Sequence, residues 1–101
     1  MLVEFSIVPL GVGASLSKYI AEVLKVIDES GIPYKITPMG TCLEGEWDEI
    51  FPLIKKCREL LLEKTDRVLL HISVDDRKGM KGRLEGKVRS VEEKIGKVLK
   101  K

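Results

Sequence analysis

The feature that most constrains this chain is the alternation of apolar and polar residues in two stretches, one near each end. Val68, Leu70, Ile72 and Val74 share one face of Arg67–Asp76, and Val3, Phe5 and Ile7 alternate with Glu4 and Ser6 in Leu2–Leu10. A period of two is typical of a strand with one buried face. The chain must therefore build a sheet whose two faces differ.

Two stretches between these strands have the spacing of amphipathic helices. In the first, Ser15 is expected to be the N-cap, Gly31 and Pro33 stop the helix, and the apolar side chains are Leu16, Tyr19, Ile20, Val23, Leu24 and Ile27. The second covers Trp47–Glu63. Proline disfavours a helix interior, so its regular part is predicted to begin at or just before Pro52.

Shorter segments complete the order. Tyr34–Thr37 and Thr41–Glu44 are predicted strands joined by a hairpin at Pro38–Gly40, and a C-terminal helix carries an apolar stripe of Leu84, Val88, Val91, Ile95 and Val98. The order β-α-β-β-α-β predicts an α+β, ferredoxin-like sandwich with an additional C-terminal helix. At 101 residues we expect a single domain over 1–101.

Two helices can cover only one face of such a sheet. Leu43 is expected to point inward, and alternation then sends Cys42 and Glu44 to the open face. The strands at the two ends add Glu4, Ser6, His71, Ser73 and Asp75, beside the apolar Leu2, Val8 and Leu69. This mixture suits a subunit interface, a ligand floor, or both.

Composition excludes several classes of function. The net charge of +2, with lysines interleaved among acids, argues against a nucleic-acid partner. No apolar run is long enough to span a membrane, and the N-terminal residues do not resemble a signal peptide. One histidine and two cysteines do not make a zinc site. We therefore expect no metal, and a cytoplasmic protein with reduced thiols at Cys42 and Cys57.

Catalytic and phosphate motifs are weak. His71, Ser73 and Asp75 alternate along one strand about 7 Å apart, too far for hydrogen bonds between nucleophile and base, so a small hydrolase is the least favoured class. The Gly11–Gly13 loop lacks the third glycine of the dinucleotide motif. The basic segment Arg77–Arg83 is more simply a strand-to-helix connection than a phosphate clamp.

The segment Thr37–Glu49 is the most unusual. Acids at a helix start explain Asp48 and Glu49, but not Glu44 or Trp47. Gly40 and Gly45 bracket a strand that is too short to need both for packing alone. An indole beside carboxylates suits a flat organic cation.

These residues carry a resemblance to a known family. Tyr34 with Pro38–Glu49, preceded by Val8–Gly11, is similar to the small thiamine-binding protein family, which is related to hydroxymethylpyrimidine/thiamine-binding domains; Arg77–Gly79 and Lys87–Lys94 resemble it too. Cys42 stands where that family commonly has a second threonine. The resemblance implies a ferredoxin-like subunit that forms homo-oligomers, often tetramers, and binds thiamine or its pyrimidine precursor without catalysis.

The chemistry of thiamine suggests which side chains would bind it. The cation calls for a carboxylate, from Glu4 or Glu44, and the rings call for walls such as Trp47 and Tyr34. Ser6, Thr37 or Thr41 could supply the remaining hydrogen bonds. We expect thiamine as ligand and no separate cofactor. The alternative is a structural or regulatory protein-interaction module that uses the open face.

The C-terminal apolar stripe also predicts self-association. Exposed apolar area costs about 25 cal/mol per Å², and closed symmetric pairing is the usual way to cover it. We expect a homodimer or homotetramer with the ligand site near a subunit boundary.

Overall fold

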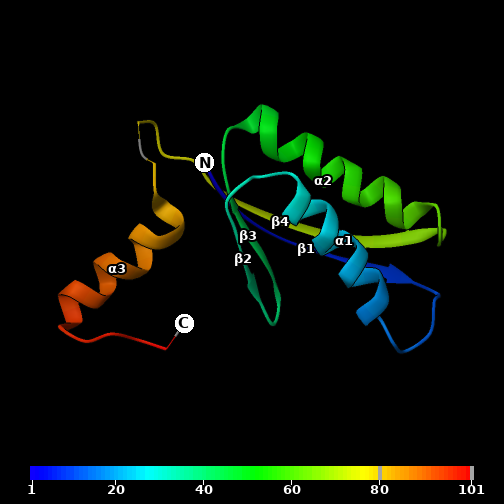
Figure 1. The fold of residues 1–101 in the computed structure, drawn as a ribbon, viewed down its shortest axis with the longest axis horizontal. Helices are drawn as coiled ribbons and strands as arrows, with labels where there is room; N and C mark the ends of the chain where they lie inside the picture. The colour runs from blue at the N-terminus through cyan, green and yellow to red at the C-terminus, as the bar shows by residue number, and fades with distance from the viewer. Residues whose placement is uncertain (80, 101) are drawn as a thin grey trace.

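The computed structural model describes residues 1–79 and 81–100. It confirms the predicted order of elements and the α+β class (Figure 1). The strands are β1 (Leu2–Leu10), β2 (Tyr34–Thr37), β3 (Gly40–Glu44) and β4 (Arg67–Asp75), and the helices are α1 (Ser17–Glu29), α2 (Trp47–Leu62) and α3 (Arg83–Ile95).

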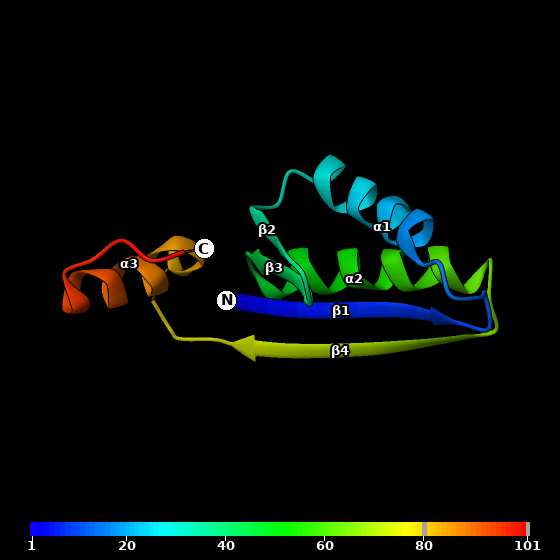
Figure 2. The same cartoon turned by 90° about the horizontal axis from the view of Figure 1, so that it is seen from below.

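The four strands form one sheet in the order β2-β3-β1-β4, and every neighbouring pair is antiparallel. β1 pairs with β4 along its whole length, from Leu2 opposite Asp75 to Leu10 opposite Arg67. Figure 2 shows α1 and α2 on the same side of the sheet, while α3 lies beyond one end. This is the ferredoxin-like arrangement with an added helix.

The core lies between the sheet and these two helices. The alternation in β1 is confirmed, because Val3, Phe5 and Ile7 are buried while Glu4 is exposed. The other buried residues of the hydrophobic core are Leu43 of β3, Val23 and Ile27 of α1, and Ile50, Leu53, Ile54, Cys57 and Leu61 of α2. On the outer strand β4, Ile72 and Val74 lie on the same face of the sheet as Phe5 and Val3, but they are 37% and 42% exposed.

Three predicted helix boundaries were wrong. The position before α1 is Leu16, whose carbonyl accepts bonds from Tyr19 and Ile20, so Ser15 is not the cap. α2 begins at Trp47, well before Pro52, because Glu46 and Glu49 form a capping box that fixes the first turn.

The third boundary is the end of α3. Gly96 adopts a left-handed conformation with φ of 75°, and its N–H bonds to the Glu92 carbonyl. Glycine reaches this conformation without strain, so it ends the helix there. Val98 therefore lies outside the helix that was predicted to carry it.

Polar contacts attach α3 to the sheet. The Arg83 backbone N–H donates to Glu44 Oε2 at 2.7 Å, and Lys35 Nζ lies 2.8 Å from Glu85 Oε1. Lys87 Nζ also reaches Asp75 Oδ2 at 2.5 Å. α3 has no buried residue, so it is held at its first turns by charge and not by a hydrophobic core.

Candidate ligand-binding site

Strand register assembles the open face as the alternation predicted. Glu4 lies opposite Cys42 on β3 and Ser73 on β4, and Ser6 lies opposite His71. Leu2 lies opposite Glu44. Because Val3 and Leu43 on the intervening positions are buried, these polar side chains share the face that α1 and α2 leave uncovered.

A cavity of about 530 Å³ lies between this face and α3. We call it the α3 cavity. The β2–β3 hairpin contributes Lys35, Ile36, Thr37 and Cys42, and α3 contributes Leu84, Glu85, Val88, Arg89 and Glu92. Pockets for small organic ligands fall in this size range and combine apolar walls with a few polar groups.

The Cys42 thiol links the cavity to Glu4. Its Sγ lies 3.9 Å from Glu4 Oε2. Partial burial, reinforced by the Glu4 charge, raises the pKa of this thiol. Cys42 is therefore a neutral, weakly polar part of the wall, beside a carboxylate that can pair with a cation.

Two other predicted site residues already have structural partners. Glu44 anchors the start of α3, so it shapes the cavity without lining it. Thr37 does line the cavity, but its hydroxyl accepts bonds from the Met39 and Gly40 N–H groups and donates to the Gly40 carbonyl. Glu44 thus fixes the start of α3, and Thr37 stabilises the turn between β2 and β3.

The other three predicted residues lie on the helix-covered side or beside it. Thr41 is only 7% exposed and pairs with Phe5. The Tyr34 hydroxyl donates to Asp28 Oδ1 at 2.7 Å, a bond that raises the pKa of the phenol. Trp47, at the start of α2, is 60% exposed and its ring centroid lies 4.2 Å from that of Phe51.

The structure thus brings Glu4, Ser6, Thr37 and Glu44 to one face and leaves Tyr34, Thr41 and Trp47 elsewhere. Ligand contact by any of the seven remains a prediction.

Gly40 has a packing role that the sequence interpretation missed. A Cβ at this position would lie 2.8 Å from the Phe5 carbonyl oxygen, closer than real contacts allow. Glycine lets β3 start this close to β1, so its presence in the motif does not by itself point to a ligand.

The residues of α3 were not predicted for the site. Their signal was the stripe Leu84, Val88, Val91 and Ile95, which we interpreted as a subunit contact alone. Nothing in the sequence indicates which surface the first turns of α3 face, because the contacts that set it, Lys35–Glu85 and Glu44–Arg83, join residues far apart in the chain.

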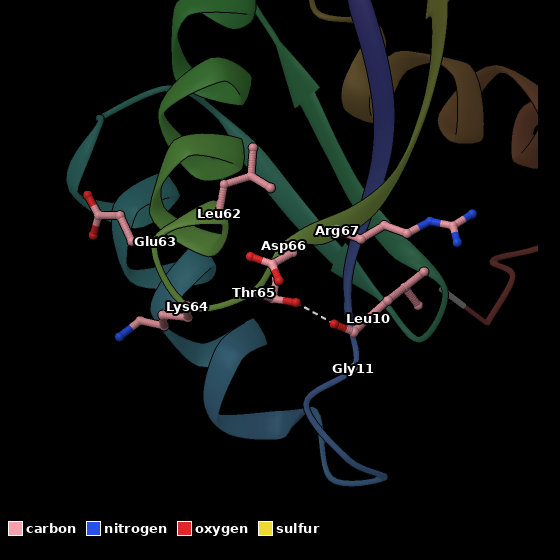
Figure 3. A pocket seen from close by; sticks show the side chains of 8 residues that line it. All are labelled: Leu10, Gly11, Leu62, Glu63, Lys64, Thr65, Asp66 and Arg67. Atoms are coloured by element: carbon pink, nitrogen blue, oxygen red, sulfur yellow. Dashed lines mark hydrogen bonds between the residues drawn. The ribbon is translucent and has the colours of Figure 1, made fainter.

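A second hollow, of about 580 Å³, lies at the opposite end of the sheet (Figure 3). It is lined by Leu10, Gly11 and residues 62–67, and the Thr65 hydroxyl donates to the Leu10 carbonyl beside it. None of the predicted site residues lines it. It lies between the β1–α1 and α2–β4 connections, and Leu10 and Leu62 are the apolar side chains among the eight residues that line it.

Within residues 1–79 and 81–100, no three or more His, Cys, Asp or Glu side chains are grouped so as to hold a metal ion. In the same part of the chain, no helix has the length and apolar character needed to cross a membrane.

Fold and cavity together define a class: a small ferredoxin-like α+β protein with an open sheet face and a cavity of small-molecule size beside it. The family described as thiamine-binding protein matches residues 3–92. The chain belongs to this family, which confirms the resemblance seen in the sequence.

Relatives extend over nearly the whole chain. A UPF0045 protein of Methanocaldococcus jannaschii is 36% identical over 93 residues, covering 92% of this chain and 93% of its own. The UPF0045 protein YqgV of Bacillus subtilis is 36% identical over 96 residues, covering 89% and 92%.

Solved structures agree with the fold. The crystal structure of the Methanocaldococcus jannaschii protein covers 91% of this chain and 95% of its own with a TM-score of 0.83 at 36% identity. A Thermotoga maritima protein, provisionally described as a thiamine biosynthesis/salvage protein, covers 89% and 96% with a TM-score of 0.78 at 27% identity.

Proposed function

We propose that this protein binds thiamine or a related pyrimidine such as hydroxymethylpyrimidine, without catalysis, in the α3 cavity. The observation that carries the proposal is the match to the thiamine-binding protein family over residues 3–92. The Thermotoga maritima neighbour described for thiamine biosynthesis or salvage supports the same chemistry.

The cavity has groups of the kinds that the ligand needs. Leu84 and Val88 give an apolar wall for a ring, and Glu4, through its contact with Cys42, brings a carboxylate to the edge of the cavity. A carboxylate there would pair with the thiazolium charge. β2 is an edge strand of the sheet, so its outward-facing backbone carbonyl groups offer acceptors for the exocyclic amine.

The open face favours binding over turnover. Ser6 and His71 lie opposite each other on β1 and β4, yet the side-chain hydrogen bonds of the described residues include none between them. A nucleophile needs such a bond to its base. We therefore propose a binding protein and not an enzyme.

Assembly and location complete the proposal. The exposed apolar stripe of α3, with Val91 48% and Ile95 56% exposed, supports a homodimer or homotetramer in which a second copy covers it. Both cysteines are free thiols, as expected of a protein that works in the reducing cytoplasm.

Titration calorimetry tests the binding. We expect heat with thiamine or hydroxymethylpyrimidine and about tenfold weaker thiamine binding in Glu4→Gln, because one charge-assisted contact is lost. Glu59→Gln, an exposed acid on α2, is the matched control and should bind as the parent does. Absence of heat with thiamine, its phosphates and hydroxymethylpyrimidine refutes the proposal.

The alternative is a structural or regulatory module whose open face docks another protein. It is favoured only by the exposed Leu69, at 45%, and by the α3 stripe. A stoichiometric protein partner in a pull-down, together with no small molecule in native mass spectrometry, would support this alternative over thiamine binding.

A further inference from the structure

Basic side chains gather where the end of β4 meets the start of α3. They surround a hollow of about 230 Å³ that is separate from the α3 cavity and is lined by Met1, Leu2, Asp75, Arg77, Arg83 and Lys87. We call it the basic hollow. It has room for several water molecules, and therefore for a tetrahedral oxyanion.

Charge in the basic hollow is unbalanced. Its one carboxylate, Asp75, pairs with Lys87 at 2.5 Å. The guanidinium groups of Arg77 and Arg83 take part in none of the ion pairs that the described residues form. Three cationic side chains against one carboxylate leave two positive charges in excess.

The three cationic side chains line the same small hollow as Asp75. The pKa of Asp75 is lowered first by its hydrogen bond to Lys87 and then by the Lys87 charge, and Arg83 and Arg77 also lower it. Arg77 from the β4–α3 connection and Arg83 from α3 thus line one hollow with this carboxylate. The electrostatic potential in the hollow is therefore positive, and a bound anion would balance the excess charge.

The backbone of Arg83 is held in place at the start of α3. Its backbone N–H donates to Glu44, and the end of its side chain lies beside Gly86, where an added Cβ would be 3.5 Å from Nη1, an ordinary contact distance. The planar guanidinium of an arginine is suited to bidentate contact with phosphate oxygens.

We propose that the basic hollow binds a phosphate-type oxyanion, held by the guanidinium groups of Arg77 and Arg83 and by Lys87. The site stands on its own residues and does not rest on the proposed thiamine binding. The anion could be free phosphate or pyrophosphate, or the phosphate ester of a larger ligand. We include the ester because Arg83 and Lys87 of the hollow and Leu84 and Val88 of the α3 cavity lie on neighbouring faces of the same turns of α3.

Calorimetric titration with pyrophosphate at fixed ionic strength tests the site. We expect saturable binding that weakens about tenfold or more in Arg83→Gln, the loss typical of one charge-assisted pair. Arg58→Gln removes the same charge from the exposed face of α2 and should change affinity less than twofold. No saturable binding, or an equal loss in both variants, overturns the proposal.

A gain of affinity excludes loss of folding as the explanation. Asp75→Asn removes the competing carboxylate and releases Lys87, so pyrophosphate should bind several-fold more tightly. Unchanged or weaker binding in this variant contradicts the site.

Thiamine and its monophosphate then identify the source of the anion. If the monophosphate binds at least tenfold more tightly than thiamine and Arg83→Gln abolishes the difference, the ligand carries the anion. If pyrophosphate and thiamine bind without affecting each other, the anion is free. If pyrophosphate binds and no thiamine compound does, the basic hollow stands and the proposed function fails.

Discussion

At the scale of single residues, several residues near the α3 cavity have structural roles that do not require contact with a ligand. Glu44 and Thr37 are engaged in backbone hydrogen bonds, and Gly40 acts through the absence of a side chain. Substitutions at these positions should therefore alter the stability of the fold and the shape of the cavity, and affect ligand binding only through that change.

Gly40→Ala is expected to destabilise the protein by about 1–3 kcal/mol, because its Cβ would meet the Phe5 carbonyl oxygen at 2.8 Å and force the backbones apart. The matched control is Gly86→Ala inside α3, where the nearest atom is the end of a flexible arginine at 3.5 Å. Helix propensity predicts that this control loses no stability and gains up to about 1 kcal/mol. Urea unfolding of both variants measures the contrast, and equal losses would contradict the close approach.

The Cys57 thiol predicts a pH dependence of stability. Burial raises its pKa from 9.0 to about 11, so the unfolded chain loses this proton first as the pH rises. The free energy of unfolding should therefore fall between pH 9 and 11 more steeply for the parent than for Cys57→Ala. Parallel curves for the two proteins would mean that this thiol does not titrate as its burial requires.

At the scale of elements, the sequence predicts what periodicity controls. Alternation found β1 and β4, and the three-four spacing found all three helices, because these patterns follow from which face is buried. The same alternation that placed Leu43 inside also places Thr41 there, two residues away. Our prediction of Thr41 as a ligand contact did not apply that rule. The structure shows the residue buried opposite Phe5, and its contact with a ligand stays a prediction.

Helix starts and the placement of α3 depend on other forces. The start of α2 is set by reciprocal side-chain bonds of Glu46 and Glu49, which outweigh the lost donor at Pro52. The position of α3 depends on ion pairs between distant residues. The capping box and these ion pairs leave no periodic pattern in the sequence. The contribution of α3 to the candidate site could therefore not be predicted.

Glu49→Ala should cost about 0.5–2 kcal/mol, because Glu49 Oε1 accepts the Glu46 N–H at 2.9 Å in the capping box of α2. Glu59→Ala, in the last turns of the same helix, loses only an exposed pair with Lys55 at 3.9 Å and should cost under about 0.5 kcal/mol. Thermal unfolding by circular dichroism compares the two. A loss for Glu59→Ala as large as for Glu49→Ala would argue against the capping role.

At the scale of the whole molecule, the packing is uneven. α1 and α2 bury Val3, Phe5, Ile7 and Leu43 of one sheet face, whereas α3 buries none of its own residues. The apolar side of α3 is therefore exposed, which is why we propose that a second molecule covers it.

Light scattering at micromolar concentration is expected to give the mass of a dimer or tetramer. Val91→Glu places a charge in the α3 stripe, where the parent valine is 48% exposed, and should shift the mass toward one chain because burying an unpaired charge is costly. Lys94→Glu changes charge on the same helix outside the stripe and should keep the parent mass. A monomeric parent at every concentration rules out this assembly.

The outer strand β4 also bears on how the protein reaches its working state. Its nine residues contain no proline, they leave one edge of the sheet open, and Leu69, Ile72 and Val74 are exposed on its two faces. Such an edge is a template for pairing with any other extended chain. In newly synthesised chains, correct folding therefore competes with aggregation through this edge. Refolding yield should fall as the protein concentration rises, and slow dilution into a large volume should recover the most protein.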